Sequence, residues 1–331
     1  MKTLKLSTAF AVFALALGTL SAGAADAKIV IKVGYGTAGG PIHEGMLEFE
    51  RRVEAANPNV DVQLFPGGQL GSEGEIIGQL QAGITDLLPT TTGPLGQHNA
   101  IYYALETPYV FLDEAQAYAV LDGPIGEKIL KGLESKGLIG LAFWENGFRE
   151  ATNNVRPIHL PEDFEGIKMR VQQSTLHMKF FKDLGANPTP LPFTEIYSSL
   201  ASGVVDGQEN PFALIATNKF YEQQKYVSKT DHVYSAVPVY YSKARWEKLP
   251  PDVRKLVKDT ITDLRTWERK RGAEMMQSYL AEIRTKSEVT ILTPAEKKAF
   301  QKAAANVYDW ARGKYGKDYS AILDAILATA K

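Results

Sequence analysis

The chain has 331 residues, among them 37 lysines and arginines, 38 aspartates and glutamates, and no cysteine. A formal net charge of −1 argues against a nucleic-acid partner and against attraction to an anionic membrane surface. The length predicts roughly two domains, and these must be stabilised by core burial because no disulfide can form.

Residues 1–25 have the pattern of a signal peptide. Two lysines precede an apolar run over residues 9–20, and small residues follow it, so we expect cleavage near Ala24 or Ala25. The alternative is a membrane anchor, but a bilayer span needs about 20 apolar residues and this run is shorter. The sequence therefore predicts an exported protein of the periplasm.

The next part of the chain alternates predicted strands with predicted helices. Ser72 and Glu75 form a capping box at the start of one helix, and Gly83 ends it. This order predicts a parallel sheet with helices on both faces. Ligands of such sheets bind at the carboxyl ends of the strands, so residues 34–43 and 89–93 should face one cleft. The predicted strands are 28–36, 60–68 and 84–93, and the predicted helices are 41–58 and 72–83.

Residues 34–39 read Gly-Tyr-Gly-Thr-Ala-Gly, which has the spacing of a dinucleotide-binding fingerprint. A dinucleotide site also needs an acidic residue at the end of the second strand. That strand ends in Phe65-Pro66-Gly67, and Asp61 lies near its start. Export also argues against NAD, which is chiefly a cytosolic cofactor. We therefore expect no cofactor, and we interpret the glycines as a loop whose backbone approaches a solute closely.

The alternation restarts in the second half of the chain, after the segment that contains residues 138–154. A second α/β lobe of about the same size as the first is the simplest explanation. The predicted strands are 166–172, 187–192 and 204–211, and the predicted helices are 175–185 and 193–203.

From Pro251 to about Lys286, apolar residues recur every three or four positions, which predicts one helix roughly 50 Å long. Such a helix is longer than one lobe and should run along both. The alternatives are two helices broken near Arg271-Gly272 and a coiled-coil dimer. The apolar positions drift too much for strict heptads, which argues against the dimer.

These observations predict an α/β protein with two lobes and a long helix that spans them. The arrangement indicates a binding protein that closes over a solute, with an exported hydrolase as the alternative. We expect the signal peptide to be followed by two discontinuous lobes, with lobe I formed by 26–146 plus 236–275 and lobe II by 147–235 plus 276–331.

No motif for catalysis stands out. None of the five histidines lies in H-E-x-x-H or in another metal-ligand spacing. The nearest match to the serine motif G-x-S-x-G is residues 71–74, which have the wrong spacing. We interpret two carboxylate pairs, Glu145 with Glu150 and Glu162 with Glu165, as solvated surface. We therefore expect no catalytic residue, no metal and no enzymatic activity.

Two arginines occupy positions that are unusual for arginine. Arg149 lies in a strand at the junction of the lobes, and Arg170 ends a predicted strand where a ligand is expected. A guanidinium offers paired donors that match both oxygens of a carboxylate. Two of them in one closed cleft would form a strong anion site. The alternative for each is an internal salt bridge, such as Arg149 with Glu150 or Glu145.

Six segments resemble the substrate-binding proteins of TRAP transporters of the DctP type, and the similarity runs in order from about Lys28 to near the C-terminus. They are FPGGQLGSEGEIIGQLQAGITDLL, ALETPYVF, NGFREATNNVRPI, GIKMRVQ, LGANPTPLPFTEIYSSLASGVVDGQENP and KFYEQQKYVSKTDHVY. The resemblance implies a two-lobe periplasmic binding protein of the Venus-flytrap type. In that family the arginines of the R-x-x-T-N and G-x-K-x-R segments hold a substrate carboxylate, and the asparagine of the E-N-P segment adds a hydrogen bond. The matching residues here are Arg149, Arg170 and Asn210.

The resemblance also implies variable residues around this anchor that choose the solute. Phe193 would be an aromatic wall or a core residue, and His43 a donor to the solute or a surface residue, while we expect His232 to be structural. By position the variable residues are the loop 39–43 with His43, residues 90–92 with Thr91, Trp144, Asn146, Gln172, Gln173 and Phe193.

The function that follows is capture of an organic acid and its delivery to a membrane permease, which the resemblance implies is an ion-driven symporter. A binding protein for an ABC importer is a further alternative. The Thr, Gln and Asn content of the expected site favours a hydroxylated acid such as a hexuronate over a C4-dicarboxylate. We expect a monomer with no nucleic-acid partner.

Overall fold

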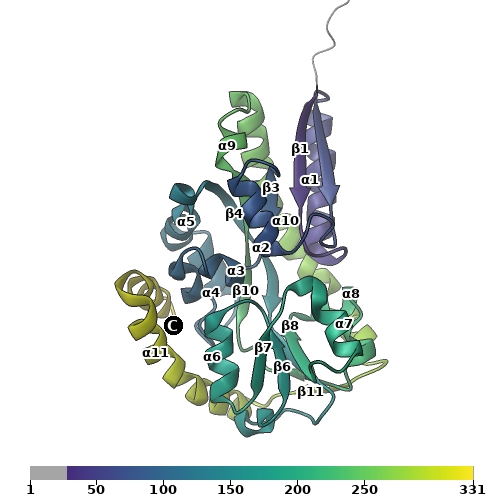
Figure 1. The fold of residues 1–331 in the computed structure, drawn as a ribbon, viewed down its shortest axis with the longest axis vertical. Coiled ribbons are helices and arrows are strands. Elements are labelled where there is room, and N and C mark those ends of the chain that lie inside the picture. Colours follow the sequence, from purple (N-terminus) through teal and green to yellow (C-terminus); the bar gives the residue numbers. More distant parts are fainter. Residues whose placement is uncertain (1–27, 331) are drawn as a thin grey trace, which may run out of the picture.

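The structure is a computed structural model that describes residues 28–330, so the predicted signal peptide lies outside the described residues. Two β-sheets, each with its own helices, lie one beyond the other along the molecule (Figure 1). We call the part built on the first sheet the first lobe and the part built on the second sheet the second lobe. The predicted two-lobe α/β architecture is confirmed.

The elements of the described chain begin and end as follows. The strands are β1 (Ile29–Gly34), β2 (Val60–Phe65), β3 (Leu87–Pro89), β4 (Leu138–Phe148), β5 (Glu150–Asn153), β6 (Lys168–Val171), β7 (Asn187–Pro190), β8 (Gly207–Asn210), β9 (Tyr226–Lys229), β10 (Tyr234–Ser242) and β11 (Glu288–Ile291). The α-helices are α1 (Gly40–Ala56), α2 (Glu73–Gln81), α3 (Thr92–Gly96), α4 (Glu114–Leu121), α5 (Pro124–Lys131), α6 (Thr175–Asp183), α7 (Ile196–Ala201), α8 (Phe212–Thr217), α9 (Lys243–Trp246), α10 (Pro251–Ile283) and α11 (Pro294–Leu327). The 3₁₀ turns are η1 (Ala100–Ala104), η2 (Glu134–Lys136), η3 (Pro161–Phe164), η4 (Phe193–Glu195) and η5 (Phe220–Gln223).

The first sheet has the strand order β2-β1-β3-β10-β4. Strand β1 pairs in parallel with β2 and β3, as the sequence predicts, and the capping box of Ser72 and Glu75 starts α2. The parallel pairing holds for the three predicted strands, but the sheet as a whole is mixed, because β10 pairs antiparallel with β3 and β4. All nine residues of β10 are buried, so its sequence shows no alternation of apolar and polar residues, and Pro238 obscures it further.

The second sheet has the order β11-β9-β5-β8-β6-β7. Strand β6 pairs in parallel with β7 and β8, whereas β5 pairs antiparallel with β8 and β9. This sheet is therefore also mixed. Strands β9 and β11 were not predicted from the sequence.

Two chain segments cross between the lobes side by side. Strand β4 of the first sheet continues into β5 of the second through the single residue Arg149, and residues 230–233 connect β9 back to β10. The segments are hydrogen-bonded to each other, because the Arg149 N–H donates to the Val233 carbonyl at 2.8 Å and the His232 N–H donates to the Arg149 carbonyl at 3.3 Å. We call these two segments the hinge.

Helix α10 is continuous from Pro251 to Ile283, so the predicted helix is confirmed and the alternative of two helices broken near Gly272 is wrong. It packs against α1 and β4 of the first lobe and against α8 of the second. Gly272 permits the close approach of α1, because a Cβ added there would lie 3.4 Å from the Cγ of Pro41. Within residues 28–330, no helix is both long enough and apolar enough to cross a membrane.

Helix α11 forms a second connection that the sequence analysis did not identify. It kinks at Gly316, which has φ 78°, and it contacts η1 of the first lobe and α6 of the second. Figure 1 shows it along the side of the molecule opposite α1. Both long helices therefore touch both lobes.

Candidate functional site

A cavity lies between the two sheets, where strand ends from both lobes meet. The volume of the cavity, including the solvent at its open mouth, is about 450 Å³. The loop after β1 and the residues at the end of β3 both line it, as predicted. The lining residues are Tyr35, Gly36, Thr37, Ile42, Glu73, Pro89, Thr91, Asn146, Arg149, Arg170, Gln172, Phe193, Asn210 and Leu214.

The cavity brings together most of the residues that the sequence analysis singled out. His43, Trp144 and Gln173 do not line the cavity. His43 instead shares a 2.8 Å hydrogen bond between its Nδ1 and the hydroxyl of Tyr35, and Tyr35 does line the cavity. The predicted residues that line the cavity are Arg149, Arg170, Asn210, Phe193, Thr91, Gln172 and Asn146.

Two further expectations for the cavity need correction. Trp144 was placed among the residues that choose the solute, but it is fully buried in the first lobe, where its Nε1 donates to the Ile261 carbonyl at 3.0 Å. Gly39 was expected to approach the solute, but a Cβ added there would lie 3.2 Å from Thr217 of α8. Gly39 therefore permits contact between α8 and the loop after β1, while Gly36 lines the cavity.

Arg170 is buried in the second lobe with part of its guanidinium unused. Its Nε and Nη2 donate to the Leu191 carbonyl at 3.0 and 2.6 Å, and among the described residues Nη1 makes no hydrogen bond. Burial lowers its pKa to about 9, opposed by the charge of Glu209 and assisted by that of Arg149. No carboxylate of the described residues forms an ion pair with it. Arg170 is thus a buried cation that an anion in the cavity would neutralise.

Arg149 lies at the hinge and is held by an internal ion pair with Glu209. Its Nε donates to one carboxylate oxygen of Glu209 and its Nη2 to the other at 2.8 Å, and Nη2 also contacts Asn210 Oδ1 at 3.1 Å. The alternative partners Glu145 and Glu150 are therefore wrong. Only Nη1, with a 3.4 Å contact to Ser235 Oγ, remains largely available.

Glu209 is an anion that the sequence analysis missed, although it directly precedes Asn210 in the E-N-P segment. Burial raises the pKa of its carboxyl, but the charges of Arg149 and His177 and a hydrogen bond from His232 outweigh this effect and hold the pKa well below its usual range. The ion pair of Arg149 and Glu209 is therefore neutral as a unit, and Arg170 is left as the uncompensated charge on the second-lobe side of the cavity.

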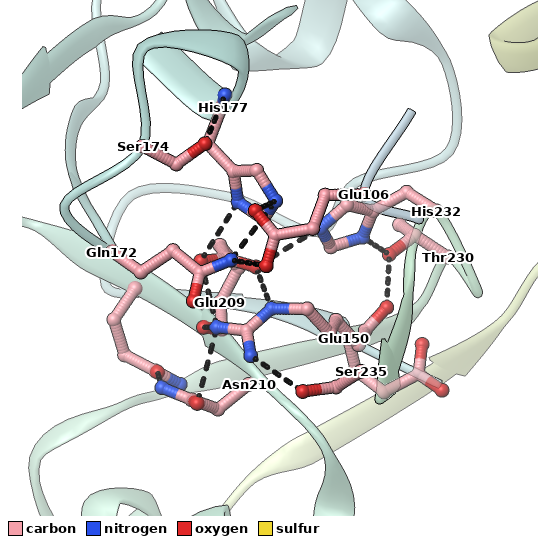
Figure 2. Close-up of polar contacts among 12 residues, drawn as sticks. Glu106, Glu150, Gln172, Ser174, His177, Glu209, Asn210, Thr230, His232 and Ser235 are labelled. Atoms are coloured by element: carbon pink, nitrogen blue, oxygen red, sulfur yellow. Dashed lines mark hydrogen bonds and ion pairs between the residues drawn. The ribbon is translucent and has the colours of Figure 1, made fainter. Parts of the chain in front are cut away.

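Figure 2 shows a buried polar network around Glu209 that includes Glu106 of the first lobe. The carboxylate of Glu106 accepts hydrogen bonds from Thr92 of the first lobe at 2.8 Å and from Gln172 of the second at 2.7 Å. The imidazole of His177 lies between two carboxylates, 3.5 Å from Glu106 and 3.5 Å from Glu209. Glu106 therefore connects the two lobes. A single glutamate in a sequence usually predicts solvated surface, so it was not identified.

The same tendency to interpret glutamates as surface residues led to a wrong prediction outside the cavity. Glu145 and Glu150, interpreted from the sequence as solvated surface, are only 8% and 1% exposed. Burial raises the pKa of both carboxyls. Glu145 accepts hydrogen bonds from the hydroxyls of Tyr118 and Tyr234, which makes its burial possible.

Glu73 brings a negative charge to the first-lobe side of the cavity and was also missed. It is the first residue of α2, where the partial positive charge of a helix N-terminus stabilises a carboxylate. Its Oε1 accepts from Thr90 Oγ1 at 2.8 Å and from the Thr91 backbone N–H at 3.0 Å. Phe193 lies near Gly36 and also packs edge-on against Phe220, with ring centroids 5.9 Å apart, so it is both a cavity wall and a core residue.

Comparison with known proteins places this geometry in context. Residues 33–314 match the family described as bacterial extracellular solute-binding protein, family 7, also called DctP. The 2,3-diketo-L-gulonate-binding periplasmic protein YiaO of Escherichia coli is 33% identical over 253 residues, which cover 76% of this chain and 77% of that protein.

Solved structures show the same fold. A TRAP periplasmic solute-binding protein of Sulfurospirillum deleyianum with bound succinate is 32% identical, with a TM-score of 0.86 over 91% of this chain and 99% of that one. The sugar-acid-binding protein DctPAm of Advenella mimigardefordensis, in complex with galactonate, is 32% identical, with a TM-score of 0.88 over 92% of this chain and 100% of that one. The similarity thus covers both lobes.

Proposed function

The chain belongs to the DctP family, the bacterial extracellular solute-binding proteins of family 7, and from that premise we propose that it captures an organic acid by its carboxylate. Arg170 binds the carboxylate, Arg149 contributes its Nη1, and Asn210 adds a hydrogen bond. The observation that carries this proposal is the buried guanidinium of Arg170, which lines the cavity with Nη1 unused.

The arrangement of donors supports this assignment. Because Nε and one hydrogen of Nη2 are used by Leu191, the end of the Arg170 guanidinium formed by Nη1 and Nη2 can bind both oxygens of a carboxylate. The amide of Asn210 is fixed in orientation, since its Oδ1 accepts from Arg149 and its Nδ2 donates to Gln208 at 2.6 Å. One Nδ2 hydrogen of Asn210 is left for the solute.

Delivery to a TRAP permease follows from closure of the lobes around the bound acid. Solute that contacts both lobes stabilises the closed form, and rotation about the hinge opens it. A membrane symporter would recognise the closed form, and the protein would act in the periplasm as a monomer. The relatives named above support a TRAP system over an ABC importer and a binding protein over a hydrolase.

A ligand screen tests the proposal. The chain from residue 26 is mixed with dicarboxylates, sugar acids, keto acids and the corresponding neutral sugars, and its thermal unfolding is followed. An acid present at a hundredfold excess over its Kd should add about 2.7 kcal/mol of stability. Recovery of that acid unchanged after prolonged incubation, checked by NMR, excludes the hydrolase. Stabilisation by a neutral sugar and by no acid would contradict the proposal.

Glu106 should contribute to closure without contacting the solute. Replacing it with alanine leaves the Thr92 hydroxyl and the Gln172 amide without their shared acceptor, so the closed form loses a buried contact between the lobes. We expect the solute Kd to rise about tenfold, equivalent to about 1.4 kcal/mol, and X-ray scattering at saturating solute to show a larger radius of gyration.

The matched control for Glu106→Ala is Gln97→Ala. Gln97 also bonds across the lobes, to the Gln173 carbonyl at 2.9 Å, but it is exposed. An exposed hydrogen bond contributes little, so affinity and radius should stay close to those of the wild type. Equal effects of the two variants would show that Glu106 is not the closing contact.

A further inference from the structure

We propose that Glu73 and Gln172 make this cavity select acids whose far end donates hydrogen bonds, and that Glu73 rejects a second carboxylate. The inference rests on the proposed function, because it takes Arg170 as the anchor of the first carboxylate. It assigns a chemical class to the solute, namely hydroxylated monocarboxylic acids.

The first observation is the unused acceptor capacity of Glu73. Its Oε1 accepts three hydrogen bonds, whereas Oε2 accepts only a long one of 3.3 Å from the Thr91 hydroxyl. A carboxylate has about four acceptor positions and no donor when it is ionised. Glu73 lines the cavity, so its remaining capacity is available to the solute. Thr91 directs its own hydrogen to Glu73 and can therefore only accept from a solute.

The second observation is the fixed orientation of the Gln172 amide. Its Nε2 donates to Glu106 Oε1 at 2.7 Å and lies 3.1 Å from His177 Nε2 (Figure 2). A carboxylate can only accept, so the amide cannot be turned to place its oxygen against Glu106. One amide hydrogen is then bonded to Glu106, which fixes the amide in this orientation. The group that Gln172 offers to the cavity is its oxygen, which is again an acceptor.

The third observation is the charge balance of the cavity. Arg149 and Glu209 cancel, which leaves one positive charge on Arg170 and one negative charge on Glu73. The two charges interact across the cavity, because Glu73 acts to raise the pKa of Arg170. One solute carboxylate compensates Arg170. A second carboxylate placed near Glu73 and Thr91 would be repelled by the charge of Glu73 and could not donate a hydrogen bond to either residue.

These observations together divide the recognition between the lobes. The second lobe offers donors to a carboxylate through Arg170, Arg149 and Asn210, and Glu73 and Thr91 of the first lobe offer acceptors. A hydroxylated chain supplies the matching donors. Closure then requires both ends of the solute, because each lobe recognises a different chemical group.

The experiment uses pairs of acids that differ only at the far end, where one member has a hydroxymethyl group and the other a carboxylate. The pairs are D-galactonate with galactarate, D-gluconate with D-glucarate, and D-erythronate with meso-tartrate. Calorimetry at pH 7.5 measures each Kd for the wild type, for Glu73→Gln, and for Glu75→Gln. The last variant removes a charge from the same helix outside the cavity, and glutamine can keep the capping box.

In the wild type, the monocarboxylate of the best-bound pair should bind at least tenfold more tightly than its dicarboxylate partner. Glu73→Gln keeps an oxygen for Thr90 and Thr91 but supplies a donor and no charge. It should weaken the monocarboxylate at least tenfold and strengthen the dicarboxylate, so that the preference disappears or reverses. Glu75→Gln should keep the wild-type preference, and the charge-conserving Glu73→Asp should still reject the dicarboxylate.

The outcomes separate this inference from the proposed function. A wild-type preference for the dicarboxylate overturns the inference, and so does an unchanged preference in Glu73→Gln. In either case, if Arg170→Ala no longer binds either acid, the assignment of Arg170 as the anchor is upheld. If Arg170→Ala binds both acids as tightly as the wild type does, the anchor is overturned and the inference with it. Failure of all six acids to bind the wild type overturns the assigned solute class.

Discussion

Replacing Arg170 with alanine should weaken binding of the solute acid by about 3 to 5 kcal/mol, more than a hundredfold in Kd. The bound carboxylate would lose its principal partner in a site from which water is excluded, so a buried anion would remain uncompensated. Arg170→Lys should also bind poorly, because an ammonium cannot reproduce the paired donors of a guanidinium. Isothermal titration calorimetry with the acid found by screening measures both variants.

Stability provides the control for this prediction. In the solute-free protein Arg170 has no carboxylate partner, so its charge costs free energy. Arg170→Met keeps the volume of the side-chain stem and removes the charge. It should lose the solute as completely as alanine does, while its urea midpoint stays the same or rises. Binding by either variant within about threefold of the wild type would show that Arg170 is not the anchor.

Glu209→Gln should affect stability in the opposite direction to Arg170→Met. In the absence of solute, it should cause a large loss of stability. The substitution leaves Arg149, which is 1% exposed, without its anionic partner. Removing one member of a buried ion pair costs about 3 to 5 kcal/mol. Urea unfolding of the solute-free protein measures this loss at pH 7.5. The matched control is Glu268→Gln, because Glu268 is equally buried but burial raises the pKa of its carboxyl well above the usual value. That control should cost little stability or increase it.

The pH dependence of stability follows from the direction of the Glu209 shift. Its pKa is depressed in the folded protein, so its contribution is complete above the unfolded value of about 4.3 and is lost as the pH falls through the folded value. The wild type should therefore lose part of its advantage over Glu209→Gln as the pH decreases below about 4.3. A stability difference that stays constant from pH 7 to pH 3 would contradict this assignment.

The sequence was sufficient for the parts of the fold that depend on local patterns. Strand β1, helices α1 and α2 and the 33-residue α10 follow from periodicity, capping residues and the absence of helix breakers. Strand β10 was not predictable in this way. It is buried on both faces and contains a proline, so neither alternation nor composition identifies it.

The site was predictable where residue type alone indicates a role. Residue type and position in the sequence indicated Arg149 and Arg170, and resemblance to a family added Asn210. Glu73 and Glu209 were missed because their roles depend on partners distant in sequence. Arg149 and Glu209 are 60 residues apart, and no local pattern indicates which of many glutamates will face an arginine.

The position of β10 also has a consequence for the order in which the chain can fold. This strand lies inside the first sheet, between β3 and β4, yet it comes after the entire run of strands from β5 to β9. Until residue 242 is available, β3 and β4 each keep an unpaired edge, and such edges promote aggregation. The second lobe can assemble its central strands from one contiguous stretch, residues 150–229, and should become protected from hydrogen exchange earlier during refolding.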